Sequence, residues 1–200
     1  MLLMTRARPT ETERGRTQRE RVLRAAMDIF STQGYRGASL DAVAEAVGMT
    51  RQGLLHYFPS KVQLLLGVLE LRHGENSAWM QEMFESTHSL ADALVTLVTH
   101  NQDRPELVRL FTVLAAESVN ADHPGHQRFV DRYRFVRTDM SGQIAAEQEA
   151  GTLSAEIEPE RLAVLLIAVM DGLQLQHLLE PDAVDMVRPL ADLLALLTPR

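Results

Sequence analysis

Residues 39–58, SLDAVAEAVGMTRQGLLHYF, read as two short amphipathic helices that meet at a tight turn. In the first half, apolar side chains recur at the spacing of a helix with one buried face, at Leu40, Val43, Ala44 and Val47. Gly48 follows them, and glycine tolerates the left-handed conformation in which helices often end. The pattern predicts a helix-turn-helix, although plain helical hairpins share its periodicity.

A residue with a hydroxyl side chain precedes each of the two helices, and polar side chains occupy the start of the second helix. Ser39 and Thr50 suit helix N-caps because a hydroxyl oxygen can accept a bond from an otherwise unsatisfied backbone N–H. A helix-turn-helix places the N-terminal residues of its second helix against base edges in the major groove. We therefore expect DNA contacts from the outward residues of this region, Ser39, Thr50, Arg51, Gln52, Gly53, His56, Tyr57 and Lys61.

Residue chemistry divides this set into base-reading and phosphate-binding groups. Arg51 and Gln52 are expected to read bases, because arginine suits guanine edges and glutamine suits adenine. Pro59 and Ser60 end the second helix, since proline disfavours helix in the residue before it. Phosphate contacts are expected from the hydroxyl and ammonium groups of Ser39, Thr50, Tyr57 and Lys61.

The same stretch resembles the DNA-binding domain of the TetR family of one-component regulators. Members typically read T-x-x-x-I-A-x-x-A-G-V-S-x-G-x-L-Y-x-Y-F-x-S-K-x-x-L, and the matching residues here are Ser39, Val43, Ala44, Val47, Gly48, Met49, Thr50, Gly53, Leu54, Tyr57, Phe58, Ser60, Lys61 and Leu64. The preceding RVLRAAMDIFSTQGYRGASL is similar to the family's first helix and following loop. The resemblance covers roughly residues 17–66.

Two departures from the family pattern affect the expected DNA contacts. Leu55 stands where many members carry a tyrosine that touches the DNA backbone. Gln52 and Gly53 reverse the residue types that are usual at their positions. The base preference of a relative therefore cannot be carried over to this chain.

Charge is distributed unevenly along the 200-residue chain, which has a net charge of −7. Residues 1–61 hold ten of the 20 Lys and Arg but six of the 27 Asp and Glu, so they carry about +4 and the remainder about −11. A basic head suits phosphate binding, and an acidic body is repelled by phosphates. The 46% hydrophobic content is enough for a sizeable core.

Several chemistries find no support in the sequence. The chain has no cysteine, which excludes disulfides, thiolate metal sites and cysteine nucleophiles. No Gly-rich phosphate loop or H-E-x-x-H motif occurs, and His123 and His126 have no nearby carboxylate set to complete a metal shell. The sequence contains no run of about 18 apolar residues, so no membrane span is expected. We expect a cytoplasmic protein, not an enzyme, with no catalytic residues, metal or cofactor.

Strand signals are nearly absent, and the periodicity predicts an all-α chain of about nine helices. We expect a flexible basic arm at 1–16, a DNA-binding domain at 17–62, and a ligand-binding and dimerisation domain at 63–200. Besides the pair in 39–58, helices are expected at 17–33, 61–84, 90–101, 106–120, 126–151, 159–180 and 182–197.

Local signals mark the ends and weak points of two of these helices. Thr17 and Glu20 form a capping box that predicts the start of the first helix, and Gly34 predicts its end. In the helix at 61–84, Gly67 and Gly74 are each expected to cost roughly 1 kcal/mol relative to alanine.

The last two helices carry the most apolar sequence, including LAVLLIAVMDGLQLQHLL at 162–179. Two such helices from each of two subunits make a four-helix bundle. The family resemblance implies the same arrangement, and an ordinary intramolecular core is the alternative. A homodimer built through these helices would present two recognition helices to a palindromic operator in double-stranded DNA.

The resemblance also implies a pocket for an unidentified small-molecule effector, because family members commonly release DNA when a ligand binds the C-terminal body. Ligand sites are mostly apolar with a few placed polar groups. The candidate lining is Trp79, Met83, Phe84, Phe111, Tyr133, Met170, Gln174 and His177, each of which is alternatively plain core. Asp171 and His177 do not share a helix face, so they are poor partners for acid–base catalysis. We expect them instead as polar groups at the dimer seam or the pocket floor.

The sequence thus predicts a DNA-binding transcriptional regulator, in particular a repressor that a ligand releases from its operator. An activator on the same scaffold is one alternative. The other is an enzyme or ligand-binding protein that retains a vestigial helix-turn-helix.

Overall fold

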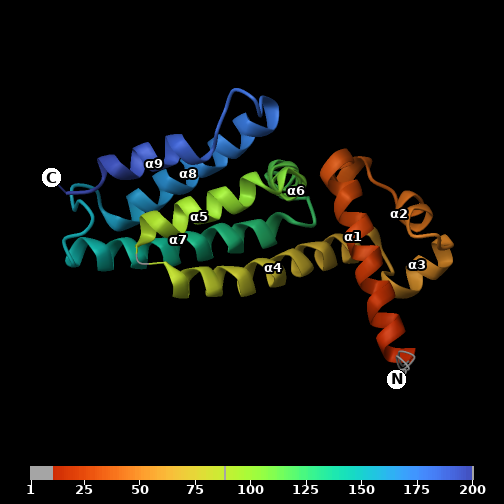
Figure 1. The fold of residues 1–200 in the computed structure, drawn as a ribbon. Coiled ribbons are helices and arrows are strands. Elements are labelled where there is room, and N and C mark those ends of the chain that lie inside the picture. The colour runs from red at the N-terminus through yellow and green to blue at the C-terminus, as the bar shows by residue number, and fades with distance from the viewer. Residues whose placement is uncertain (1–10, 88, 200) are drawn as a thin grey trace, which may run out of the picture. The chain divides into compact units, whose positions relative to one another are not determined.

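The computed structural model describes residues 11–87 and 89–199, and the side chains of all of these except 11–14, 72–82, 84 and 85. The described residues form nine helices and no strand (Figure 1), which confirms the predicted all-α class. The helices are α1 (Glu11–Gly37), α2 (Leu40–Ala46), α3 (Arg51–Tyr57), α4 (Lys61–Ser86), α5 (Leu90–Gln102), α6 (Pro105–Glu117), α7 (His126–Glu149), α8 (Pro159–Leu179) and α9 (Val187–Leu196).

The chain divides into two compact units, residues 1–72 and 73–200, and the boundary falls inside α4. The helix-turn-helix, α2 and α3, lies in the first unit. The first turns of α4 belong to the same unit, and their side chains Leu64, Leu65 and Val68 are fully buried. The first unit therefore extends about ten residues beyond the boundary expected at residue 62.

Gly67 shows why the start of α4 belongs with α1. A Cβ atom at Gly67 would lie 2.9 Å from Leu23 Cδ2 and 3.0 Å from Phe58 Cε1. Leu23 and Phe58 are themselves buried, so in a close-packed core neither side chain can move aside freely. The sequence predicts only a local weakening of the helix at Gly67, whereas in the structure the glycine permits close packing of α4.

Gly67→Ala is expected to destabilise the protein, although alanine is the better helix former. Alanine gains about 1 kcal/mol in helix propensity, but overpacking a core costs typically about 1–3 kcal/mol. Gly142→Ala in α7 is the matched control, because a Cβ there would meet nothing within 4 Å. Only the control should gain free energy of unfolding in chemical denaturation. Equal gains at both positions would contradict the packing argument.

α1 begins earlier than the sequence predicts. It starts at Glu11 and not at a cap formed by Thr17, so residues 11–16 are helical and do not belong to a flexible arm. The sequence of this segment lacks an apolar stripe, which is why periodicity does not predict the extra turns. Residues 1–10 of the expected arm lie outside the described residues. At the other end, Gly34 breaks the helical geometry with φ of 68°, as predicted.

α5, α7, α8 and α9 share one hydrophobic core in the second unit, where they run side by side (Figure 1). α8 contributes one face to this core, through Leu162, Ala163, Leu166, Ile167 and Met170. Because the sequence of α8 is apolar nearly all round, its other side presents apolar residues outside the core.

α9 begins at Val187, five residues after the predicted start at Asp182. Contacts distant in sequence hold the intervening segment in turns. His177 Nδ1 lies 2.7 Å from the Val184 carbonyl oxygen, and the backbone N–H of Met186 donates to Gln102 Oε1 at 3.1 Å. Met186 is fully buried, so the segment descends into the core before α9 starts.

Candidate DNA interface and effector site

Both helices of the helix-turn-helix are capped as predicted. Ser39 Oγ accepts a hydrogen bond from the Ala42 N–H at 3.1 Å, and Thr50 Oγ1 accepts one from the Gly53 N–H at 3.1 Å. Between the helices, Gly48 adopts a left-handed conformation with φ of 67°. A hydroxyl oxygen that accepts in a cap still carries an O–H donor, so Ser39 and Thr50 remain chemically able to donate to a phosphate.

The polar side chains expected to contact DNA lie on the solvent side of the motif. Ser39, Thr50, Arg51, Gln52 and His56 are exposed, and Gly53, Tyr57 and Lys61 are half-buried. Leu54, on the opposite face of α3, is fully buried. The motif therefore has one face that anchors it and another that carries hydrogen-bonding groups to solvent.

Two of the predicted DNA-contacting cations already have partners within the first unit. Arg51 Nη1 donates to Asp41 Oδ2 at 3.0 Å, which links the start of α3 to the first turn of α2. Lys61 Nζ donates to the Arg36 carbonyl oxygen at 3.2 Å and lies 4.6 Å from the centre of the Tyr35 ring. These contacts hold both side chains near the ends of helices, although Arg51 remains 59% exposed.

Gly53 is explained by packing inside the motif. A Cβ at this position would approach Met49 Cε and Thr50 Oγ1, each at 3.3 Å. Met49 is itself held by Gln18 of α1, whose Nε2 lies 3.0 Å from the methionine sulfur. A side chain at Gly53 would therefore press on the corner of the turn and on the α3 cap.

The eight predicted effector residues fall into different settings. The side chains of Trp79 and Phe84 lie outside the described residues. Met83 and Met170 are buried, the latter in the core of the second unit. Gln174 and His177 are half-buried on α8, where His177 also holds the turn after the helix. The structure brings two of the predicted residues together, Phe111 and Tyr133, whose rings are tilted relative to each other with their centres 6.2 Å apart.

Two charged side chains, Arg132 and Asp171, contact these two aromatic residues. We call Phe111, Arg132, Tyr133 and Asp171 the aromatic–acid cluster. Tyr133 donates its hydroxyl hydrogen to Asp171 Oδ2 at 2.8 Å, which joins α7 to α8. The Arg132 guanidinium lies 4.8 Å above the Phe111 ring, a cation–π arrangement that joins α7 to α6. The sequence leaves Asp171 open between the dimer seam and the pocket floor, and it does not single out Arg132 as a site residue.

Burial shifts the pKa values of the ionisable groups in this cluster. Desolvation raises the pKa of Asp171, and this outweighs the hydrogen bond from Tyr133 and the positive charge of Arg132. Desolvation also raises the pKa of Tyr133, with further contributions from the bond to Asp171 and from its charge. Desolvation lowers the pKa of Arg132, although a guanidinium stays protonated at neutral pH. The cluster thus keeps charged groups in poorly solvated surroundings, as ligand sites often do.

The free energy of unfolding of Asp171→Asn, relative to that of the wild type, is expected to increase as pH rises. The raised pKa means that the folded state holds this proton to higher pH than the unfolded state does. The wild type therefore loses stability as pH rises from the unfolded pKa, about 4, through the folded value. Asparagine does not titrate and keeps an oxygen for Tyr133. Urea unfolding at pH 3.5 and 7 checks this, with Asp182→Asn as baseline; a pH-independent difference would contradict it.

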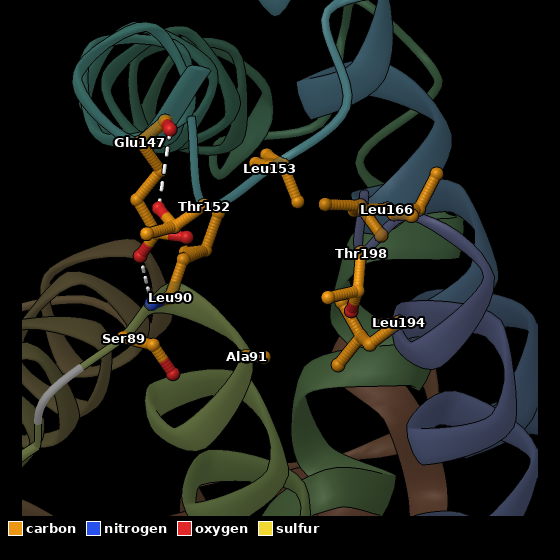
Figure 2. Close-up of a pocket in the computed structure, with 10 residues that line it drawn as sticks. Ser89, Leu90, Ala91, Glu147, Thr152, Leu153, Leu166, Leu194 and Thr198 are labelled. Carbon is orange, nitrogen blue, oxygen red and sulfur yellow. Dashed lines mark hydrogen bonds between the residues drawn. The ribbon is translucent and has the colours of Figure 1, made fainter. Parts of the chain in front are cut away.

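A cavity of about 190 Å³ lies between the start of α5, the α7–α8 connection, α8 and α9 (Figure 2). Half of its ten lining residues are leucine. Three of its four polar side chains are engaged within the protein: Glu147 accepts the Leu90 N–H, Thr152 donates to the Glu147 carbonyl, and Ser89 accepts the Asp92 N–H. The six predicted effector residues whose side chains the structure describes do not line this cavity. Apolar cavities of this size can hold a small apolar molecule, but this one offers few groups for specific recognition.

A capped helix-turn-helix with an exposed polar face, followed by a separate helical unit, defines a helix-turn-helix DNA-binding protein. The chain belongs to the TetR family. The family model for bacterial regulatory proteins of the tetR family matches residues 22–68, and the model for the C-terminal domain of BetI-type transcriptional repressors matches residues 86–198. The protein is therefore a DNA-binding transcriptional regulator, as the sequence predicts.

Individual relatives agree with this assignment. The HTH-type transcriptional regulator CymR of Pseudomonas putida is 28% identical over 141 residues, which cover 68% of this chain and 70% of CymR. RutR of Escherichia coli K12 is 27% identical over 159 residues, 76% of this chain and 71% of RutR. The crystal structure of a transcriptional regulator from Saccharomonospora viridis in complex with choline has the same fold, with a TM-score of 0.82 at 21% identity, covering 92% of this chain and 100% of that one.

Proposed function

We propose that this protein is a homodimeric repressor that binds a palindromic operator through α3 and leaves it when a small molecule enters the second unit. The exposed, capped start of α3 carries this proposal, because it presents Arg51 and Gln52 to solvent above a buried anchor, Leu54. These are side chains that read guanine and adenine edges. Ser39, Thr50, Tyr57 and Lys61 flank them and supply donors for phosphates. Regulation and not catalysis is the activity that we assign.

Repression is supported by the C-terminal match. The family model that covers residues 86–198 describes BetI-type transcriptional repressors. Relatives such as CymR and RutR carry the broader name of transcriptional regulator, which is compatible with repression.

The exposed apolar side of α8 supports dimerisation through the last two helices. Val164, Leu165, Leu175 and Leu179 are between 48% and 77% exposed, and they recur along one side of the helix. Leu196 of α9 is 77% exposed as well. Contiguous apolar surface of this kind marks an interface. A second copy that places its own α8 and α9 against this surface would complete a four-helix bundle.

α8 is also, within the described part of the chain, the helix whose length and hydropathy would allow it to span a membrane. This is weak evidence, since core helices of soluble proteins meet the same criteria. One side of α8 is already buried in the core of the second unit. Burial of the other side in a dimer accounts for its apolar residues without a membrane, in keeping with a cytoplasmic regulator.

The aromatic–acid cluster is the part of the second unit that we assign to effector binding. It combines aromatic faces from Phe111 and Tyr133 with the charges of Arg132 and Asp171, and Gln174 lies less than one helical turn from Asp171 on α8. Apolar surfaces with a few placed polar groups are typical of ligand sites. The same fold holds a small molecule in the S. viridis regulator.

The test is selection of bound duplexes from a random pool, followed by titration of the selected duplex at two salt concentrations. A palindromic consensus and a steep salt dependence are the expected results. Weak binding without sequence preference would refute the proposal and favour a vestigial helix-turn-helix.

Lys61→Ala should weaken binding to all duplexes alike and reduce the salt slope by about one unit, as expected for a phosphate contact.

Gln52→Ala should instead relax the preference at one position per half-site. The same titrations measure both effects. An unchanged salt slope would remove Lys61 from the DNA contacts, and an unaltered sequence profile would remove Gln52 from base reading.

A further inference from the structure

Asp41 is an acidic side chain on the face of the helix-turn-helix that carries the predicted DNA contacts. It lies in the first turn of α2, and its Oδ2 accepts a hydrogen bond from Arg51 Nη1 at 3.0 Å. Both side chains are well exposed, at 63% for Asp41 and 59% for Arg51. An exposed pair of this kind contributes little to folding stability. The main effect of the pair is therefore on the orientation of the Arg51 side chain.

The geometry leaves the guanidinium able to read a base. Arginine carries five N–H donors in a planar fork, and the bond to Asp41 engages Nη1. Donors on the other nitrogens remain for a bidentate contact to guanine O6 and N7. A carboxylate that holds one side of the fork also restricts the rotamers of a long side chain. Ordering such a side chain otherwise costs up to roughly 25-fold in an equilibrium constant.

We propose that Asp41 is a specificity-determining residue, which orients Arg51 for base reading before DNA arrives. The inference rests on the proposed function, because it requires that Arg51 contacts bases. Asp41 does not itself touch a base in this scheme and acts by positioning Arg51. Its carboxylate also places a negative charge among residues that face phosphates, which weakens binding to DNA of any sequence. Asp41 thus reduces affinity and raises selectivity.

The opposite signs of these two effects make the proposal testable with binding profiles. The binding profile of Arg51→Ala is first compared with that of the wild type. The base position at which preference is lost is the one that Arg51 reads. Asp41→Ala is then expected to lower the preference at that position by about 3- to 10-fold, which is part of the roughly 5- to 140-fold discrimination of a bidentate contact. Preference at other positions should be unchanged, and binding to random-sequence duplex should tighten a few-fold.

Glu45→Ala is the matched control, because Glu45 is another exposed acid of α2 and its loss changes the net charge equally. It should leave the preference at the Arg51 position intact. Asp41→Asn separates charge from orientation, since asparagine keeps an oxygen that can accept from Arg51. It should retain most of the preference while binding random duplex as tightly as Asp41→Ala. Thermal unfolding of each variant confirms that the domain is folded.

Each outcome bears on a different claim. If the wild type selects a consensus but Asp41→Ala leaves the preference at the Arg51 position unchanged, the inference is wrong. It is equally wrong if Asp41→Ala has the same effect on the profile in an Arg51→Ala background, or if Arg51→Ala alters no position. If the wild type selects no consensus at all, the proposed function fails and the inference falls with it.

Discussion

Replacing Leu165 and Leu175 by glutamate is expected to turn the proposed dimer into monomers and to abolish operator binding. The two side chains are 51% and 48% exposed on α8 in a single chain. Burying a leucine fully contributes about 1.5–3 kcal/mol, and the two-fold symmetry of a dimer counts each position twice. Glutamates at the same positions would have to be buried as charges, which costs considerably more unless they are paired.

The loss of DNA binding follows from the loss of linkage between two heads. A dimer binds its second half-site as an intramolecular step, which raises affinity by roughly 10²- to 10⁴-fold over a single head. Sedimentation and duplex titration of the double variant measure both effects together. Val119→Glu is the control, because Val119 is 81% exposed in the turn after α6 and does not belong to α8 or α9. A double variant that stays dimeric would rule out α8 as the interface.

Leu54→Ala is expected to destabilise the first unit by about 2–5 kcal/mol, the range measured for leucine truncations in cores. Leu54 is fully buried on the inner face of α3, so truncation leaves a cavity beneath the recognition helix. Such a loss is a large part of the roughly 5–15 kcal/mol that stabilises a typical domain. Operator affinity should fall with it, because a partly unfolded head cannot hold α3 in the groove.

Leu55→Ala is the matched control for this truncation. Leu55 is the next residue of α3 and only half-buried, so the same chemical change removes less buried surface. Chemical denaturation and duplex titration of both variants are the measurements. Equal losses of unfolding free energy at positions 54 and 55 would show that Leu54 is not the anchor of α3. A far larger loss of DNA affinity at position 55 would assign Leu55 a direct contact.

Features set by neighbours within one helical turn could be predicted from the sequence. The caps at Ser39 and Thr50 and the stops at Gly34 and Gly48 all form as expected, because each depends on groups three or four residues away. The same holds for the apolar faces of the helices. The family assignment also follows from local sequence, since one continuous stretch, residues 22–68, matches the family's N-terminal model.

Contacts between distant residues could not be predicted in this way. Gly67 looks like a weak point in a helix until Leu23 and Phe58 pack against it. The start of α9 depends on Met186 entering the core and on Gln102, 84 residues away, binding its backbone. In each case the local preference is worth about 1 kcal/mol and burial outweighs it.

The sequence by itself determined the class of this protein: an all-α regulator with a helix-turn-helix whose outward residues could be named. The tertiary structure decided how those residues are held and which polar groups meet in the second unit. Arg51 meets Asp41 ten residues away, and Tyr133 meets Asp171 across 38 residues. Helical periodicity assigns each side chain to a face of its own helix, whereas partners between helices depend on how those faces pack together.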